Sequence, residues 1–407
     1  MFASLLSALQ LQPLAWLLSA PARRGLVLGS CLLPATSPLA RTTPFLITHG
    51  GTYTGTFRST SSDVPCVRIL TTEPVVLEQC VLYGPGNLIE AEQGRARLTI
   101  THCQAFGLLP TEDGRPPGRF LSANQPTALR VEHNYLEQTA GMYIYQWSGS
   151  GAADQTLTVR YNEARNIDGR KRGGGEILVQ FLQLNTVIGL PNVEIAWNQV
   201  VNEPNRSRVE DNISLFNSSG TPTSPIRVHD NYVQGAYPFP ALAKGFSGTG
   251  MTTDGDGSTP TTTTAYVEAY DNQFVSTCNA AMNIAAGHHI RYHHNRLVTS
   301  GQLPNGTQLN ATYAAASIFN SYKKPDSVFF AHRIEANVIG YAKTGYRVPL
   351  ADRHDLSTGA CAACPGNVSL PNPITLATEQ GEWAYWQRKL QQKKISLATT
   401  PLAAQAP

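Results

Sequence analysis

The sequence predicts an all-β chain built as a solenoid, in which one short strand motif returns coil after coil. Two observations support this fold class. Charged residues make up only 14% of the 407 residues, against roughly 25% in an average soluble domain, and 34 glycines with 27 prolines supply many turns. In addition, one six-residue pattern occurs nine times along the chain. Together these features favour many short strands over long helices.

The first forty residues predict a secretory signal region. Arg23 and Arg24 precede an apolar stretch from Leu26 to Leu33, and small residues follow, which is the order of a signal peptide. Leu28-Gly29-Ser30-Cys31 resembles a bacterial lipoprotein box, so Cys31 is either a lipid anchor or part of a discarded signal. We therefore expect a secreted or extracytoplasmic protein. Past this region no apolar run reaches the roughly 18 residues of a membrane span.

The repeated pattern reads apolar, any, apolar, any, any, Asn. Alternating apolar residues indicate a strand with one buried face, and its regular return predicts a solenoid over residues 42–348. Seven copies end at Asn134, Asn162, Asn198, Asn231, Asn272, Asn295 and Asn337, and two earlier copies end at Cys80 and Cys103.

The asparagines are expected to form one column along the solenoid. An Asn side chain can bond local backbone at a turn and tolerates left-handed dihedrals. Stacked at the strand spacing of roughly 4.8 Å, the amides can also bond one another. Cys80 and Cys103 occupy the same slot, so they should be stacked neighbours.

A second set of strands lies between the Asn-containing strands. In each, the first and third residues are expected to point inward and the second and fourth outward. These strands are Met142 to Tyr145, Ile177 to Gln180, Ile213 to Phe216, Met251 to Asp254 and Met282 to Ala285.

The C-terminal part, residues 349–407, differs from the rest. A loop rich in Pro, Gly and Cys contains Cys361 and Cys364, which indicate a local disulfide or two free thiols. Thr378 to Lys394 predicts a helix with one apolar face that carries Trp383 and Trp386. Because solenoids need their open ends covered, this helix is interpreted as a cap, with a partner-binding helix as the alternative.

The Asn-ending copies, together with Gly50-Gly51-Thr52-Tyr53-Thr54-Gly55, resemble the right-handed parallel β-helix proteins, a superfamily that includes pectate lyases and polygalacturonases. The resemblance covers roughly residues 42–340 and implies a right-handed parallel β-helix. Polygalacturonases carry Gly-His-Gly where this chain has Gly287-His288-His289, and their Arg-Ile-Lys motif is missing. No specific enzyme family is therefore matched, and the fold alone does not define the chemistry.

Outward positions of the second strand set predict a binding face. Aromatic and polar side chains in parallel columns suit an extended sugar polymer, although the same aromatics could simply be buried beneath loops. The candidate substrate-binding residues are Tyr143, Tyr145, Trp147, Gln180, Phe216 and Asn283.

Candidate catalytic residues follow the same strands. Asp254 and Asp256 can act as general acid and base or bind Ca²⁺ through oxygen, whereas Asp-Gly pairs are also ordinary turn sequences. His288, one coil later, can serve as an acid, a base or a substrate ligand.

A basic loop contains Arg170, Lys171 and Arg172 among glycines. Polyuronate lyases that resemble this fold use Arg or Lys as the base that removes a proton next to a carboxylate. The loop is therefore a candidate site for an anionic sugar, with a solvated loop as the alternative.

Two classes of function remain open from the sequence. One is a carbohydrate-active enzyme, a lyase or a hydrolase, acting on an extended polysaccharide that is anionic if the basic loop takes part. The other is a non-catalytic β-helix for adhesion or glycan binding. The net charge of +3 is too small to indicate nucleic acid as a partner, and a monomer is expected.

Overall fold

The computed structural model describes residues 43–311, 313–342, 353–357 and 364–398. Within them the chain is mostly β, its strands run parallel in long sheets, and one helix lies near the C-terminus. This confirms the all-β prediction with parallel strands. The predicted signal region with Cys31, and also Cys361, lie outside the described residues. No helix in the described part is long and apolar enough to cross a membrane.

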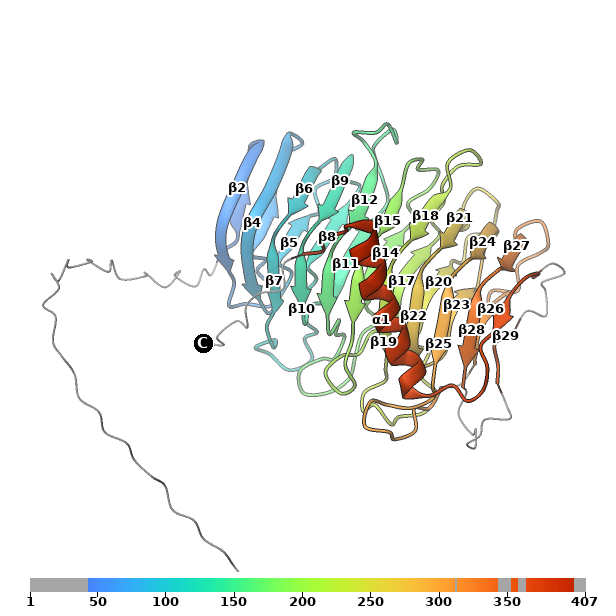
Figure 1. The fold of residues 1–407 in the computed structure, drawn as a ribbon. Helices are drawn as coiled ribbons and strands as arrows, with labels where there is room; N and C mark the ends of the chain where they lie inside the picture. Colours follow the sequence, from blue (N-terminus) through green and yellow to red (C-terminus); the bar gives the residue numbers. More distant parts are fainter. Residues whose placement is uncertain (1–42, 312, 343–352, 358–363, 399–407) are drawn as a thin grey trace, which may run out of the picture. The chain divides into compact units, whose positions relative to one another are not determined.

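One sheet is a single ladder, which we call the first ladder. Each strand pairs with the strand one repeat before it and the strand one repeat after it (Figure 1). Its members are β1 (Phe45–Ile47), β3 (Val67–Ile69), β5 (Ile89–Ala91), β8 (Leu121–Asn124), β11 (Gly141–Tyr145), β14 (Gln180–Asn185), β17 (Asp211–Phe216), β20 (Thr249–Asp254), β23 (Ala280–Ile284), β26 (Ala314–Ile318) and β29 (Leu356–Ser357).

The other sheet contains two ladders joined by long strands. β4 pairs with β6 through its first half and with β7 through its second half. The second ladder comprises β2 (Gly51–Arg58), β4 (Pro74–Gly84), β6 (Arg97–Thr101), β9 (Ala128–Glu132), β12 (Leu157–Arg160), β15 (Glu194–Ala196), β18 (Ile226–His229), β21 (Ala265–Tyr270), β24 (His288–His293) and β27 (Phe330–Glu335). The third comprises β7 (Gln104–Gly107), β10 (Tyr135–Glu137), β13 (Glu163–Arg165), β16 (Gln199–Val201), β19 (Tyr232–Ala236), β22 (Gln273–Thr277), β25 (Arg296–Thr299), β28 (Val338–Tyr341) and β30 (Val368–Ser369).

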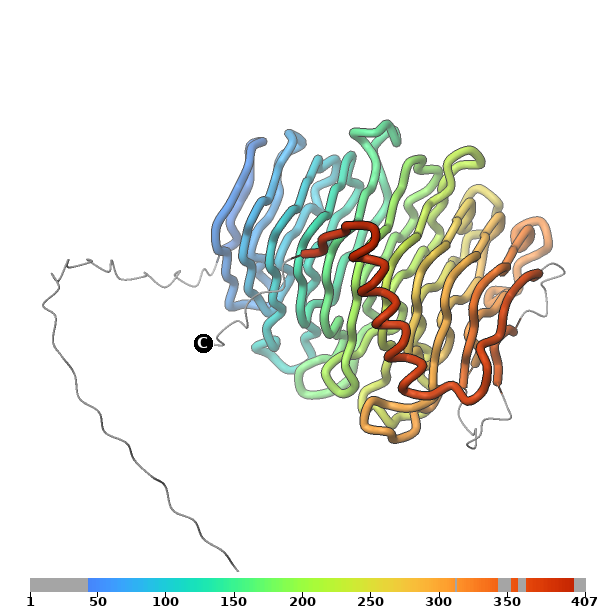
Figure 2. Tube along the Cα trace, in the orientation of Figure 1, coloured from blue at the N-terminus to red at the C-terminus, as the bar shows by residue number. Residues whose placement is uncertain are grey.

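Figure 2 shows the chain advancing repeat by repeat, with each repeat beside the previous one. The apolar positions of the repeated pattern form the core: Leu157 and Val159 of β12, for example, are completely buried. Because alternate residues of a strand face opposite sides of the sheet, the residues between them face outward. The arrangement is compatible with the predicted solenoid.

The predicted asparagine column is confirmed. In each repeat the Oδ1 atom accepts the backbone N–H of the preceding column member, and the Nδ2 group donates to the Oδ1 of the next. From Asn198 to Asn231 these distances are 3.0 Å for the backbone bond and 2.9 Å for the amide bond. The column runs from Asn134 to Asn337 and continues to Asn367, which the repeat pattern did not include.

The left-handed backbone lies one residue earlier than expected. His133, Tyr161 and Trp197, each directly before a column asparagine, have φ values of 57°, 61° and 56°, whereas no column asparagine is among the described residues with positive φ. The asparagine therefore contributes hydrogen bonds, and its neighbour makes the turn.

Two thiols begin the column. Cys103 Sγ accepts the backbone N–H of Cys80 at 3.4 Å, and the Cys103 N–H donates to Asn134 Oδ1 at 2.9 Å. Both cysteines are buried and free, so they are stacked neighbours without a disulfide. Cys364, by contrast, is disulfide-bonded.

The helix α1 (Leu376–Lys393) lies across the third ladder, against β22 and β25 (Figures 1 and 2). Trp386 is fully buried, and its ring stacks on Trp197 and Tyr232 with centroid distances of 6.1 and 5.8 Å. The prediction that this helix caps the open end is wrong, because the apolar face shows which side of a helix is buried but not which surface it covers.

Charged side chains hold the helix on the ladder. Glu382 forms two bonds of 2.6 and 2.7 Å with Arg296, and its Oε2 also accepts from Gln273. Glu382 is 3% exposed, so removing one partner of this pair would leave an uncompensated buried charge.

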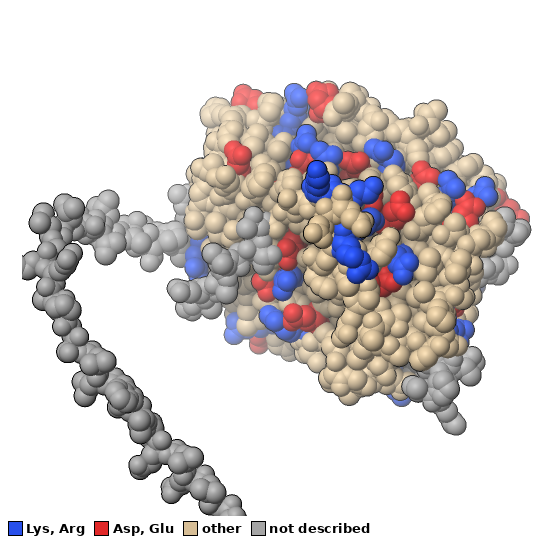
Figure 3. Space-filling model, in the orientation of Figure 1, with Lys and Arg blue, Asp and Glu red and all other residues tan. Residues whose placement is uncertain are grey.

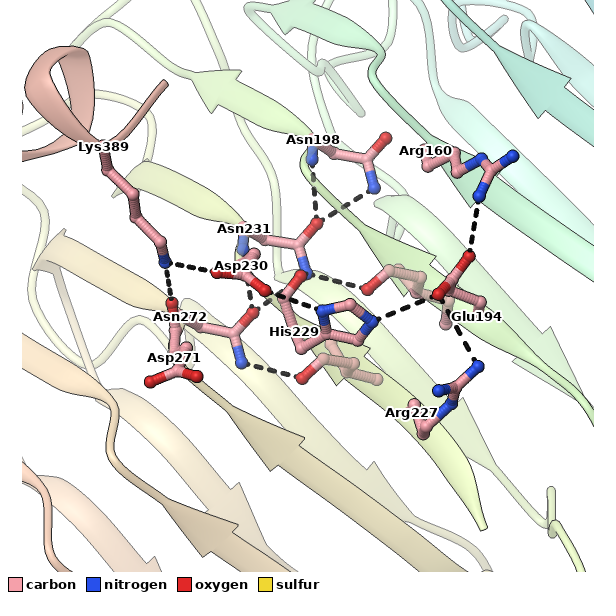
Figure 4. A network of polar contacts seen from close by, with 12 residues as sticks. Arg160, Glu194, Asn198, Arg227, His229, Asp230, Asn231, Asp271, Asn272 and Lys389 are labelled. Atoms are coloured by element: carbon pink, nitrogen blue, oxygen red, sulfur yellow. Dashed lines mark hydrogen bonds and ion pairs between the residues drawn. The ribbon is translucent and has the colours of Figure 1, made fainter. Parts of the chain in front are cut away.

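A chain of polar contacts extends from the helix onto the second ladder (Figure 4). Lys389 Nζ lies 2.7 Å from Asp230, which contacts His229 at 2.8 Å, and Glu194 lies between His229 and Arg160. Burial lowers the pKa of His229, but its bonds to Asp230 and Glu194 outweigh burial and raise it. Figure 3 shows charges of both signs intermixed on this face.

Candidate functional site

The outward side chains of the first ladder form two columns across neighbouring strands. Strand pairing aligns Tyr143 with Gln183 and Tyr145 with Asn185. Met142 and Ile144, the residues that alternate with the tyrosines along the strand, are buried. One column contains Ser122, Tyr143, Gln183, Ser214, Thr252, Asn283 and Ser317, and the other contains Asn124, Tyr145, Asn185, Phe216 and Asp254. Ser214 and Thr252 are each 3% exposed and Ser317 is completely buried, whereas the tyrosines, the amides, Phe216 and Asp254 are at least partly exposed. We call the outward side of these strands the first-ladder face.

Gln180 is not a member of these columns, contrary to the sequence prediction. It begins β14 and pairs with Gly141, and a register shift follows directly. Gln180 is 4% exposed, and its Oε1 has no hydrogen-bond partner. The prediction failed because two apolar pairs, Ile177 with Val179 and Leu182 with Leu184, both fit an alternating strand, and the β-bulge selects the second pair.

Aromatic rings occupy one part of the face. The rings of Tyr143 and Tyr145 are nearly parallel, 5° apart, with centroids separated by 6.3 Å, and Tyr145 is 37% exposed. The Arg119 guanidinium lies 4.8 Å from the Tyr143 ring centre. Trp147 is half-buried, and its Nε1 has no partner. Tyrosines in this arrangement offer flat apolar surfaces with polar hydroxyl tips.

Carboxylates occupy the part three repeats further on. Asp254 ends β20, is half-buried, and accepts hydrogen bonds from the Gly255 N–H at 2.8 Å and from the Tyr322 hydroxyl. Burial raises the pKa of Asp254, and the charge of nearby Asp256 adds to the rise. Asp256 is exposed and accepts from Asn217 Nδ2 at 2.8 Å. Asp254 therefore faces the columns, whereas Asp256 holds the adjoining loop.

Asp211 is an acid that the sequence reasoning missed. It begins β17 and accepts a hydrogen bond from Thr249 Oγ1 on the neighbouring strand. Burial raises the pKa of Asp211 to about 8, and the charges of Glu210 and Asp254 act in the same direction. A carboxyl group with this pKa retains its proton at neutral pH. The adjacent pair Glu210-Asp211, directly before an apolar strand, was the available signal.

The pKa of Tyr322 responds to the charges of these acids. Burial raises its pKa, and so do the charges of Asp254, Asp256 and Asp211. These charges act through space, and of the three carboxylates Asp254 is the one that accepts a hydrogen bond from the phenol. The register places Asp211 at the start of β17, opposite Thr249, and Asp254 at the end of β20, opposite Phe216, so the two acids lie toward opposite ends of neighbouring strands.

His288 does not join them. It begins β24 on the second ladder, is 2% exposed, and its ring stacks on Phe330 at 4.8 Å. Its Nε2 donates to the Pro260 carbonyl at 2.9 Å, and burial lowers its pKa. The predicted position beside Asp254 on the outward face is wrong, because residues of the intervening loop cover the imidazole.

The basic loop lines a separate cavity of about 430 Å³, which we call the basic cavity. Arg170 Nε donates to both oxygens of Asp168, and its terminal nitrogens donate to backbone carbonyls. Arg172 donates to the Pro110 carbonyl at 2.9 Å. Lys171 and Phe239 complete the lining, which includes no residue of the two columns. These cations therefore do not extend over the first-ladder face.

The described residues contain no group of three His, Cys, Asp or Glu side chains arranged to hold a metal ion. Comparison with known proteins adds no relative: no family model, no curated protein and no solved structure matches the chain.

Proposed function

We propose that this protein is a right-handed parallel β-helix that binds an extended polysaccharide along the first-ladder face and hydrolyses it there. The handedness follows from the general rule that connections between parallel strands of one sheet are right-handed in about 98% of cases. Secretion and a monomeric state, as the sequence predicts, belong to the same proposal.

The size of the face supports an extended ligand. Five strands, from β11 to β23, carry the column of Tyr143, and the first four of them also carry the column of Tyr145. At roughly 4.8 Å per strand they extend over about 20 Å, enough for several sugar units. Tyr143 and Tyr145 would contact the apolar faces of sugar rings at one end, while Asp254 lies toward the other.

The observation that carries the hydrolase proposal is the presence of two acids, Asp211 and Asp254, on the neighbouring strands β17 and β20, with Tyr322 hydrogen-bonded to Asp254. Hydrolysis needs one protonated carboxyl group to donate to the leaving oxygen and one carboxylate to activate water or attack the sugar. Asp211, with a pKa raised to about 8, suits the donor, and Asp254, held by Tyr322 and the Gly255 N–H, suits the carboxylate. The C–O bond breaks, the leaving oxygen takes the proton of Asp211, and a water molecule adds its hydroxyl group to the sugar carbon while its other proton passes to Asp254.

A lyase reaction, the other enzyme class predicted from the sequence, finds less support. Its base and its uronate-binding cations were assigned to Arg170, Lys171 and Arg172, which line the basic cavity. Hydrolysis requires no cation on the face.

A non-catalytic glycan-binding protein is the second candidate. Asp256 bonds Asn217, and Asp254 bonds its own loop, which are stabilising roles that need no substrate. The tyrosine pair alone would suffice for binding.

A panel of polysaccharides tests both candidates. New reducing ends would show hydrolysis, and ultraviolet absorbance of unsaturated products would show elimination. We expect Asp211→Asn and Asp254→Asn each to lower turnover by at least about 100-fold, the lower range for one general acid or base. Asp154→Asn, an exposed carboxylate paired with Arg97, serves as the control. Full turnover in both site variants would refute the assignment, and binding without cleavage by the wild type would favour the second candidate.

A further inference from the structure

We propose that the polysaccharide is uncharged, an inference that rests on the proposed function and specifies its substrate class. The sequence left an anionic polymer open because of the basic loop. The first-ladder face offers a different set of groups.

The strands that build the face carry hydroxyl, amide and aromatic side chains. From β11 to β26, six consecutive strands contain neither lysine nor arginine, and their only ionisable acids are Asp211 and Asp254. The outward residues between the tyrosines and Asp254 are Gln183, Asn185, Ser214, Phe216 and Thr252.

Cations beside the face already have partners. Arg119 lies over the Tyr143 ring and donates to the Ala140 carbonyl. Lys324 Nζ donates to the Asp256 carbonyl at 2.5 Å. Arg170 is bound to Asp168 in the basic cavity. Arg119 therefore stands at the tyrosine end of the face, where the Tyr143 ring covers it, whereas Lys324 and Arg170 are bound outside the two columns.

The physical consequence differs for the two kinds of polymer. Between the tyrosines and Asp254, carboxylates of an anionic polymer would lose water and find neither lysine nor arginine on the strands beneath them, and they would approach the charge of Asp254, which repels them. Hydroxyl groups of an uncharged polymer can exchange hydrogen bonds with the amides of Gln183 and Asn185, which are partly exposed and both donate and accept.

Calorimetric titration at low temperature with hexasaccharides tests this inference. The uncharged probes are the hexamers of glucose, xylose and mannose, and the anionic probe is hexagalacturonate. We expect at least one uncharged hexamer to bind at least about tenfold tighter than hexagalacturonate, a difference that corresponds to one order of magnitude in Kd. Tyr145→Ala should weaken that binding by a similar factor, whereas Leu109→Ala, exposed at the basic cavity, should not.

A reversal of the charge provides a second measurement. Gln183→Lys or Asn283→Lys adds a cation at a partly exposed position of one outward column, and each should gain binding of hexagalacturonate that weakens as salt rises. Thr158→Lys on the second ladder, where Thr158 pairs with Glu194, is the matched control and should gain none. Tighter binding of hexagalacturonate by the wild type would overturn the uncharged substrate and leave the proposed function standing. Failure of every hexamer to bind would overturn both.

Discussion

Replacement of Asn231 by Ala provides a direct test of the asparagine column. Asn231 is fully buried. Its Oδ1 accepts from the Asn198 backbone N–H at 3.0 Å and from Asn198 Nδ2 at 2.9 Å, and its Nδ2 donates to the Ile195 carbonyl at 2.9 Å. Alanine leaves three buried polar groups of neighbouring repeats without these partners.

Each buried group left without a partner costs about 1–3 kcal/mol. Since the three groups share one small site and relax together, we expect Asn231→Ala to lower the free energy of unfolding by about 3–5 kcal/mol. The measurement is the urea midpoint followed by circular dichroism.

The matched control is Asn367→Ala at the end of the column. Asn367 is half-buried, and its Oδ1 accepts from Asn337, so water can replace the lost bonds and the cost should be about 1 kcal/mol. A loss below about 1 kcal/mol for Asn231→Ala, or equal losses for both variants, would refute the idea that burial of the column determines its contribution.

Three further predictions concern the helix and the thiols. Burial raises the pKa of Glu379 to about 7 from 4.5, so the folded protein binds this proton more tightly and stability should fall as pH rises from about 4.5 to about 7. In Glu379→Gln this part of the slope of melting temperature against pH should disappear, and an unchanged slope would contradict the assignment. Trp386→Ala should cost about 3–5 kcal/mol of helix docking, measured as faster proteolytic release of the C-terminal segment, whereas Tyr385→Ala, 43% exposed, should change little; equal rates would show that Trp386 is not the anchor. Alkylation of the denatured, unreduced protein should label both Cys80 and Cys103, and protection of this pair would indicate a disulfide.

The features that repeat were predictable from the sequence. Asn134 to Asn337 recur at one position of a strand pattern, and each copy independently indicates the same buried slot. The inward side of the strand from Met142 to Tyr145 was also predictable. In so short a run, only Met142 and Ile144 fit the alternation of buried residues.

Features that occur once were not predictable in the same way. The strand that contains Gln183 follows a loop, and two alternating apolar pairs, one before Gln180 and one after it, fitted a strand equally well. The register shift after Gly141, which decides between them, leaves no signal in the sequence. Burial of His288 depends on a loop folding over it. The role of Asp211 depends on its neighbours across the ladder, and Trp386 could have covered any apolar surface.

The asparagine column has a consequence for how such a chain can change its length. Between repeats, each amide bonds the repeat before it and the repeat after it, so an added repeat could join the series at an internal boundary by copying two sets of bonds. Every such addition would extend the first-ladder face by about 4.8 Å. The length of the first-ladder face is therefore set by the number of repeats. Gene duplication can change that number in whole steps while the surroundings of Asp254 stay in place.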